Sequence, residues 1–202
     1  MSVFVNGNAI FNAARQGHYA VGAFNTNNLE WTRAILKAAQ ETNTPVLIQV
    51  SMGAAKYMGD YKLVKKLVEE EMRVMNITVP VIMHLDHGNY SSVMFDGHDL
   101  PFEENLEKTA EIVKLAHAKG ISVEAEVGSI GGEEDGIVGE GELASVEEAK
   151  QIAALGVDYL ACGIGNIHGP YPENWKGLHF DRLQEIADAI DTPLVLHGGS
   201  GI

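Results

Sequence analysis

Three histidines in this chain are each followed directly by glycine. His87, His168 and His197 each close a different apolar run of the kind that forms a buried strand. Three neutral imidazoles with one open coordination position make a catalytic zinc site. Glycine after each histidine lets a ligand approach the backbone closely. The alternative is three unrelated polar residues at strand ends, and the repeated His-Gly context favours the metal site.

Carboxylates form a second group of candidates. Asp86 directly precedes His87, where it could exchange a proton with a substrate bound to the metal. Glu124 and Glu126 are two residues apart in the run VEAEVG, so they face the same side of a predicted strand. Two acids on an inward face cost free energy unless a cation compensates them. We therefore expect a second cation or a lysine beside this pair.

Two glycine-rich segments could also carry chemistry. SIGGEEDG (129–136) is either a solvated surface turn or a mobile loop that carries a base, Glu133 or Glu134. HGGSG (197–201) follows an apolar run, and glycine-serine loops in that position present backbone N–H groups to phosphate. The second segment, next to a candidate metal ligand, predicts a phosphate-binding loop.

The elements that must position these residues alternate between strand and helix. Apolar runs predict strands at 19–25, 45–51, 79–88, 92–97, 122–128, 158–166 and 193–199. Helical spacing of apolar residues predicts helices at 29–42, 61–75, 101–120, 145–156 and 180–190. The strands are rich in Val, Ile and Leu, as strands buried on both faces are. The pattern is typical of an α/β fold with a parallel sheet.

Two parallel architectures compete. A doubly wound sheet usually has its glycine-rich phosphate loop after the first strand, and AFNTNN (23–28) is not such a loop. Polar residues instead collect at the carboxyl ends of nearly every predicted strand. They are Asn25, Ser51, Asp86, His87, Asp96, Glu126, Asn166, His168 and His197. A site drawn from all strand ends is what a (β/α)8 TIM barrel builds, so we predict one barrel domain over residues 1–202.

The predicted barrel is incomplete. Parallel neighbours need a crossover of about a dozen residues, and only three residues separate Gly88 from Ser92. Those strands either form a hairpin or have lost a helix's worth of residues, and we favour the loss of the third helix. A barrel of this kind takes roughly 250 residues, so the eighth strand and helix are expected to be missing after Ile202.

Composition narrows the partners. The chain has 14 Lys and Arg against 28 Asp and Glu, a net charge of −14, which argues against nucleic acid or an anionic membrane as the partner. No apolar run has the length of a membrane span, and MSVFVNGNAIF does not have the pattern of a signal peptide. Cys162 is the only cysteine, so an intramolecular disulfide is excluded. We expect a cytoplasmic protein.

Four motifs, in the order HLDHG, VEAEVGSIGGEEDG, GIGNIHGPYP and LHGGSGI, resemble those of the class II, metal-dependent fructose-bisphosphate aldolases. YAVGAFNTNNLEWTRAIL and PVLIQVSMGAAKYMG resemble the bacterial branch of that family. The resemblance covers essentially the whole chain, and the related tagatose-bisphosphate aldolases share most of it. It implies a zinc enzyme that cleaves a small phosphorylated sugar, fructose 1,6-bisphosphate, as a homo-oligomer (dimer or higher).

The resemblance also implies a role for each motif residue. His87, His168 and His197 match the zinc ligands, and Asp96 and Glu126 match positions that hold a second divalent or monovalent cation. Asp86 matches the acid/base that exchanges a proton with the C4 hydroxyl, and Glu134 matches the loop residue that handles the proton at the dihydroxyacetone-phosphate carbon. The substrate contacts, including the backbone loop, match Gly169, Gly198, Gly199, Ser200, Asn25 and Ser51. His84 matches a residue that supports the metal.

Zinc in such a site acts as a Lewis acid on the ketone oxygen and stabilises the enediolate. A Schiff-base lysine is then not required, so Lys56 is interpreted as a structural or substrate-contact residue. The sequence departs from the family at three places: the helix between HLDHG and SVMFDG, the usual Ser-His that His98-Asp99 replaces, and the phosphate-binding strand after HGGSGI. The four histidines outside the motifs are interpreted as surface residues; they are His18, His98, His117 and His179.

Three alternatives stay open. The substrate could be tagatose 1,6-bisphosphate, which differs from the fructose sugar only in the configuration at C4. The chain could be an inactive fragment that still binds metal. A metal-dependent hydrolase barrel is the third, but such sites begin with His-x-His on the first strand, which YAVGAFN does not contain.

Overall fold

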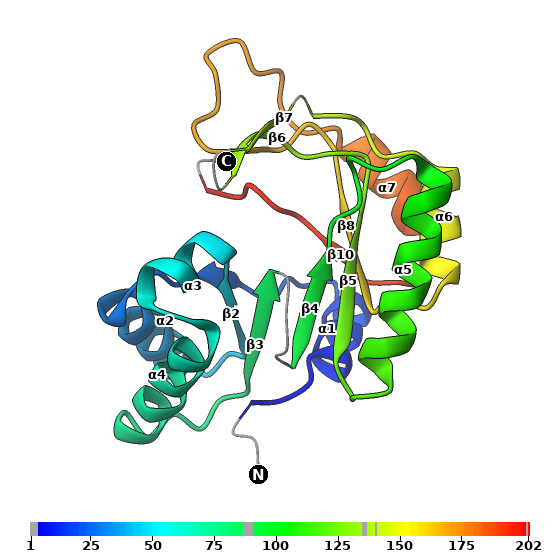
Figure 1. Cartoon of the computed structure of the whole chain (residues 1–202). Coiled ribbons are helices and arrows are strands. Elements are labelled where there is room, and N and C mark those ends of the chain that lie inside the picture. The colour runs from blue at the N-terminus through cyan, green and yellow to red at the C-terminus, as the bar shows by residue number, and fades with distance from the viewer. Residues whose placement is uncertain (1–3, 87–90, 135–136, 140, 201) are drawn as a thin grey trace. The chain divides into compact units, whose positions relative to one another are not determined.

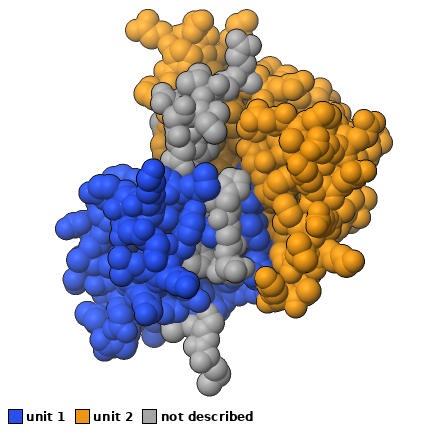
Figure 2. Space-filling view, viewed as in Figure 1, with its two compact units in different colours: residues 1–94, 120–122 blue, residues 95–119, 123–202 orange. Residues whose placement is uncertain are grey.

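The computed structural model describes residues 4–86, 91–134, 137–139, 141–200 and 202. Its contacts group the chain into two compact units, which Figure 2 distinguishes by colour. The first unit comprises residues 1–94 and 120–122, and the second comprises residues 95–119 and 123–202. Each unit has its own set of parallel strands and its own helices (Figure 1). The single domain expected over residues 1–202 stays a prediction.

The first unit is built on parallel strands in the order β1-β2-β3-β4. The strands are β1 (Ala23–Asn25), β2 (Val46–Val50), β3 (Val81–Asp86) and β4 (Ser92–Phe95). The helices are α1 (Asn8–Gly17), α2 (Leu29–Thr42), α3 (Met52–Met58) and α4 (Tyr61–Val74). Every residue of β2 is buried, which is what a central strand of a parallel sheet requires.

The core of the first unit lies between β2, β3, α2 and α4. Leu36 of α2, Val68 of α4 and Ile48 of β2 are completely buried and belong to one apolar cluster. The apolar residues of the two helices recur at helical spacing, so one face of each helix is apolar and packs inward. Burial is lower at the edge of the sheet, where Phe24 on β1 is 52% exposed.

The second unit contains parallel strands in the order β5-β8-β10 and a small sheet in the order β7-β6-β9. The strands are β5 (Ser122–Val127), β6 (Gly131–Glu134), β7 (Ile137–Gly139), β8 (Tyr159–Cys162), β9 (Ile167–His168) and β10 (Leu194–Val195). The helices are α5 (Phe102–His117), α6 (Val146–Ala154) and α7 (Phe180–Ala189). All six residues of β5 are buried.

The predicted alternation of strand and helix is present, with shorter strands than the apolar runs indicate. Helix α2 occupies the range that its spacing predicts, 29–42, and α4 ends one residue before the predicted 75. Two helices, α1 and α3, were not predicted. Helix α3 has only seven residues, and it begins where the Ser51 Oγ accepts the Ala54 N–H at 3.2 Å. A helix this short leaves little periodic signal.

Strands β3 and β4 pair in parallel, so the hairpin alternative is wrong. Their register places Ser92 opposite His84 and Met94 opposite Asp86. Between Asp86 and Ser92 the chain therefore has to go back about 7 Å along the strand direction and cross about 5 Å to the neighbouring strand. Residues 87–91 have enough length for that distance. The expectation that so short a link could not join parallel neighbours is wrong for this staggered register, and β3 and β4 have no crossover helix between them in the part of the chain that the structure describes.

Within the described ranges, none of the helices combines the length and the hydropathy that crossing a bilayer would need.

Helix α4 provides a test of the local structure. Its N-cap is Asp60, whose Oδ1 accepts the backbone N–H of Leu63 at 2.7 Å. Replacing Asp60 with alanine leaves that N–H without its acceptor, so we expect Asp60→Ala to lower the free energy of unfolding by about 1 kcal/mol in urea denaturation. Asp60→Asn keeps an acceptor oxygen and should lose much less. Equal losses in the two variants would contradict the capping role.

Candidate metal and catalytic site

The second unit buries two carboxylates on one strand. Glu124 and Glu126 of β5 are only 3% and 4% exposed. The sequence predicts that they face the same side, and such a pair is costly unless each carboxylate has a partner. In the structure, the carboxylates of Glu124 and Glu126 have different neighbours.

Glu124 is paired with a histidine. Its Oε1 lies 2.7 Å from Nε2 of His197, whose side chain is 10% exposed. With Glu124 ionised, Nε2 donates the hydrogen bond, and Nδ1 of His197 then carries the ring lone pair. A carboxylate that fixes the tautomer of an imidazole in this way is the usual companion of a metal-binding histidine. The pair therefore fits the predicted role of His197.

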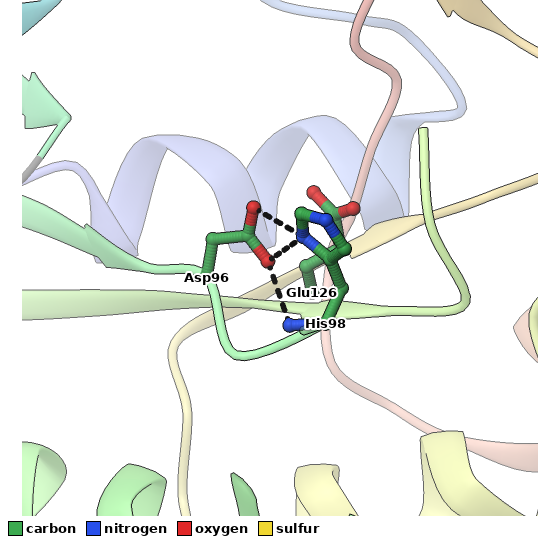
Figure 3. Close-up of side chains that lie close together, drawn as sticks. All are labelled: Asp96, His98 and Glu126. Carbon is green, nitrogen blue, oxygen red and sulfur yellow. Dashed lines mark hydrogen bonds and ion pairs between the residues drawn. The ribbon is translucent and has the colours of Figure 1, made fainter. Parts of the chain in front are cut away.

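Glu126 lies in a cluster with Asp96 and His98. These three side chains each offer one ligand atom, and the three atoms lie within 4.8 Å of one another. Figure 3 shows the three side chains together, with the imidazole of His98 against the carboxylate of Asp96. Nδ1 of His98 is 2.8 Å from each oxygen of Asp96. His98 is exposed, as predicted, and its ring also belongs to this cluster.

The cluster shifts the proton affinity of its members. Burial, reinforced by the charge of Asp96, raises the pKa of Glu126 to about 8, and His197 and the Ile130 N–H oppose the rise. That N–H donates to Oε1 of Glu126 at 3.2 Å. Burial disfavours the charged imidazolium of His98, yet the hydrogen bond and the charge of Asp96 raise its pKa above the ordinary value. Asp96 and Glu126 thus compete for the positive charge of the His98 imidazolium.

His168, on β9, and His197, two residues after β10, lie side by side. Their ring centroids are 5.8 Å apart in an edge-on arrangement. Nδ2 of Asn166 donates to the carbonyl of His197 at 3.0 Å, and the hydroxyl of Tyr171 donates to the carbonyl of Gly198 at 2.9 Å. The segment after β10 is therefore tied to the segment around β9. The third predicted ligand, His87, lies outside the described residues.

Close backbone approach explains two of the glycines near these histidines. Gly198 has φ of 68°, and a Cβ there would overlap the carbonyl of Ile167. Gly132 has φ of 95°, and a Cβ there would overlap the carbonyl of His168. A side chain at either position would push the strand of His168 away. Gly199 and Ser200, the rest of the predicted phosphate loop, are exposed.

Part of the acidic segment 129–136 forms strand β6. This strand pairs with β7 in antiparallel register and with β9 in parallel register, where Gly132 lies opposite His168. The backbone of Glu134 is therefore two residues along β6 from a position that faces a predicted zinc ligand. The side chain of Glu134 lies outside the described residues, so its role stays a prediction.

The remaining predicted residues of the first unit lie at the ends of its strands. Asp86 is the last residue of β3, and its side chain is outside the described residues. His84, on the same strand, is 1% exposed, and its Nδ1 lies 2.8 Å from Oγ of Ser92. Asn25 ends β1, and Ser51 caps α3. Gly169 follows β9 in the second unit, with φ of 87°.

Lys56 does not have the surroundings of a Schiff-base lysine. It lies in the last turn of α3 and is exposed, whereas a nucleophilic amine is activated in a desolvated pocket or beside another cation. Two imidazoles side by side, one of them held by a buried carboxylate, are instead a donor set that fits a metal ion. Tyr171, which links the two histidine segments, was not recognised in the sequence, because its contacts depend on the tertiary fold.

The raised pKa of Glu126 predicts a pH dependence of stability. Between about pH 4.5 and about pH 8, the folded chain keeps a proton on Glu126 that the unfolded chain releases. The free energy of unfolding of the metal-free protein should therefore fall as pH rises through this range, by at most about 1.4 kcal/mol per pH unit from this group. Glu126→Gln removes the titrating group, so it should remove this component in urea denaturation with EDTA present.

The matched control is Glu107→Gln, on the exposed face of α5. Its profile of stability against pH should run parallel to that of the wild-type protein. If the Glu126→Gln profile is also parallel to the wild-type one between pH 5 and pH 8, the proton on Glu126 is not present in the folded state.

Comparison with known proteins gives this arrangement a context. The family model of class II fructose-bisphosphate aldolases matches residues 5–202. A fructose-bisphosphate aldolase of Streptococcus pyogenes serotype M1 is 62% identical over 202 aligned positions, which cover 94% of this chain and 69% of the relative. The fructose-bisphosphate aldolase of Ureaplasma parvum is 52% identical over 213 positions, which cover 100% of this chain and 73% of the relative.

The second alignment bears on the predicted loss of a helix. It has 213 positions against the 202 residues of this chain. About 11 positions of the relative thus have no counterpart here, close to the dozen residues of a crossover between parallel strands. The chain is thus shorter than this relative over the aligned region, and the place of the predicted loss, between HLDHG and SVMFDG, stays a prediction.

The fold also has solved counterparts. A crystal structure described as a fructose-1,6-bisphosphate aldolase from Coccidioides immitis is 34% identical and superposes with a TM-score of 0.84, covering 96% of this chain and 73% of that chain. The predicted fold class, α/β of the TIM-barrel type with only part of the barrel in this chain, is confirmed. Because the family model matches nearly the whole of this chain, the chain belongs to the class II fructose-bisphosphate aldolases, a family of metal-dependent lyases.

Proposed function

We propose that the protein reversibly cleaves fructose 1,6-bisphosphate into dihydroxyacetone phosphate and glyceraldehyde 3-phosphate. The observation that carries this proposal is the pairing of His168 with His197, one of them held by Glu124. The family and the names of the relatives give the substrate, a phosphorylated sugar. A cytoplasmic location and a homo-oligomeric state, dimer or higher, stay predictions.

The proposed catalytic metal is zinc, held by His87, His168 and His197. When bound, zinc would polarise the ketone oxygen of the sugar and so stabilise the negative charge that develops during cleavage. Glu124 supports this arrangement by fixing the ring of His197. His84, buried within β3 and hydrogen-bonded to Ser92, is proposed to support the metal indirectly. Asp96 and Glu126 are proposed to bind the second cation, divalent or monovalent.

The protein's own residues are proposed to move two protons. Asp86 takes the proton from the C4 hydroxyl as the C3–C4 bond breaks, and the electron pair of that bond stays with C3. Glu134 then returns a proton to the same carbon, which completes dihydroxyacetone phosphate. The parallel register of β6 with β9, which carries His168, supports a place for Glu134 near the metal ligands.

Backbone groups are proposed to bind the phosphate of the dihydroxyacetone half. The candidates are Gly169 and the loop Gly198, Gly199 and Ser200, because exposed glycine-rich backbone presents N–H groups to an anion. The bond from Tyr171 to the carbonyl of Gly198 holds the start of that loop in place. Asn25 and Ser51, at the ends of strands of the first unit, are proposed as contacts to the rest of the sugar.

A coupled assay tests the proposal. With fructose 1,6-bisphosphate, NADH and glycerol-phosphate dehydrogenase, we expect dihydroxyacetone phosphate to form, EDTA to abolish its formation and zinc to restore it. Asp86→Asn should lower kcat by about 10²–10⁴-fold, because it removes a general base. Borohydride added with dihydroxyacetone phosphate should leave activity intact, since no Schiff base forms.

Tagatose 1,6-bisphosphate is the comparison substrate. A higher kcat/KM for tagatose than for fructose 1,6-bisphosphate would overturn the substrate assignment and keep the metal-dependent cleavage. Failure to cleave either sugar, with zinc bound, would instead identify an inactive chain that retains its metal site.

A further inference from the structure

The hydroxyl of Tyr171 makes two backbone hydrogen bonds and so links the segment around β9 to the segment after β10. It accepts the N–H of Ile167 at 3.2 Å and donates to the carbonyl of Gly198 at 2.9 Å. The N–H of Ile167 can only donate, so the hydroxyl proton is left for the carbonyl of Gly198. The direction of both bonds is therefore fixed, and one oxygen atom joins the two segments.

The ring of Tyr171 packs against Trp175. The two ring centroids are 4.2 Å apart in a tilted arrangement, and Nε1 of Trp175 donates to the carbonyl of Gly165 at 2.8 Å. Both rings come from the connection between β9 and α7. The ring contact and the bond to Gly165 restrict the movement of the tyrosine, so its hydroxyl is held at a defined place beside Gly198.

Asn166 makes a matching bond to the residue before Gly198. Its side chain is completely buried, its Oδ1 accepts the N–H of Ile164 at 2.8 Å, and its Nδ2 donates to the carbonyl of His197. The carbonyls of two successive residues, His197 and Gly198, are thus both held by side chains of one segment, residues 166–171.

The two held carbonyls determine where the next two N–H groups point. In a trans peptide the N–H lies opposite the C=O, and the peptide bonds of the described residues are trans. The N–H groups of Gly198 and Gly199 therefore point away from the side chains of Asn166 and Tyr171. The φ of Gly198 is 68°, and a left-handed residue between two peptides is typical of a backbone nest, in which successive N–H groups face one anion.

We propose that Tyr171 is a positioning residue for phosphate, whose hydroxyl orients the peptide between Gly198 and Gly199 so that the N–H of Gly199 faces the phosphate of the substrate. Asn166 orients the N–H of Gly198 in the same way. The inference rests on the phosphate site of the proposed function. Because the phosphate is bound in the same way before and during cleavage, loss of the Tyr171 hydroxyl should raise KM and leave kcat nearly unchanged.

The test is Tyr171→Phe, which keeps the ring against Trp175 and removes only the hydroxyl. In the zinc-loaded variant, we expect KM for fructose 1,6-bisphosphate to rise about 3–10-fold, the effect of one lost hydrogen bond. The value of kcat should stay within about twofold of the wild-type value. The inhibition constant of inorganic phosphate should rise by the same factor as KM, and the zinc affinity measured by calorimetry should not change.

A general disturbance of the fold would give a different result. It would weaken the binding of zinc as well as phosphate, and that outcome would overturn the proposal. Equal KM and equal phosphate inhibition in folded Tyr171→Phe and wild-type protein would overturn it as well. Tyr57→Phe is the matched control, because Tyr57 on α3 is 80% exposed and belongs to the first unit. Its kinetic constants should equal those of the wild-type protein.

A measurement on the unchanged chain covers the case in which Tyr171→Phe does not fold or the wild-type protein cleaves no sugar. Glycine labelled with ¹³C at the carbonyl and with ¹⁵N selects the amides that follow another glycine, and the sequence has two, Gly132 and Gly199. Gly199→Ala assigns the signal of Gly199, since a Cβ there meets nothing within 4 Å.

Inorganic phosphate should shift the amide signal of Gly199 in the wild-type protein, and folded Tyr171→Phe should need about 3–10-fold more phosphate for the same shift. A Gly199 signal that does not move at tens of millimolar phosphate would overturn the inference even if the protein cleaves fructose 1,6-bisphosphate. A shift without cleavage of either sugar would instead overturn the proposed function alone.

Discussion

The burial of two carboxylates on β5 is the constraint on which the organisation of the second unit depends. An ionised carboxylate away from water costs several kcal/mol unless it is paired or hydrogen-bonded. Glu124 meets this demand through His197, which comes from the far end of the chain, and Glu126 meets it through the Ile130 N–H and by a raised pKa. The segment after β10 must therefore fold back against β5, and this return places His197 beside His168.

The same constraint links the fold to metal. A cation that binds the folded chain and not the unfolded one adds its binding free energy to the free energy of unfolding. In the metal-free second unit, the acids are compensated by protons and imidazoles, which are weaker substitutes for a divalent charge. In the proposed function, Glu126 is a cost in the free protein and a cation ligand in the loaded one, and Glu124 holds the ring of His197. These two proposed roles would account for two glutamates on a buried strand of six residues.

Much of the fold could be predicted from local signals, and the contacts of the site could not. The spacing of apolar residues from Leu29 to Thr42 predicts α2, and the structure buries Thr32, Leu36 and Ala39 on one face of that helix. The polar residues at strand ends follow from the parallel order of the strands. The link between β3 and β4 was judged too short for parallel pairing. The sequence does not show how far two paired strands are staggered, and the stagger decides how long the link must be. The links from Tyr171 and Asn166 join residues 27 and 31 positions apart, and no periodicity reports such contacts. The contact of the exposed His98 with Asp96 was missed for the same reason, although its position two residues after Asp96 was a usable signal.

In the proposed function, histidines at the strand ends hold a catalytic zinc ion. The most direct measurement is diffraction from zinc-loaded crystals on both sides of the zinc absorption edge. We predict an anomalous difference peak at about 2.0–2.1 Å from a ring nitrogen of His168 and from one of His197, with Glu124 still hydrogen-bonded to the ring of His197. Zinc found only at other positions, with these two rings bound to none, would contradict it.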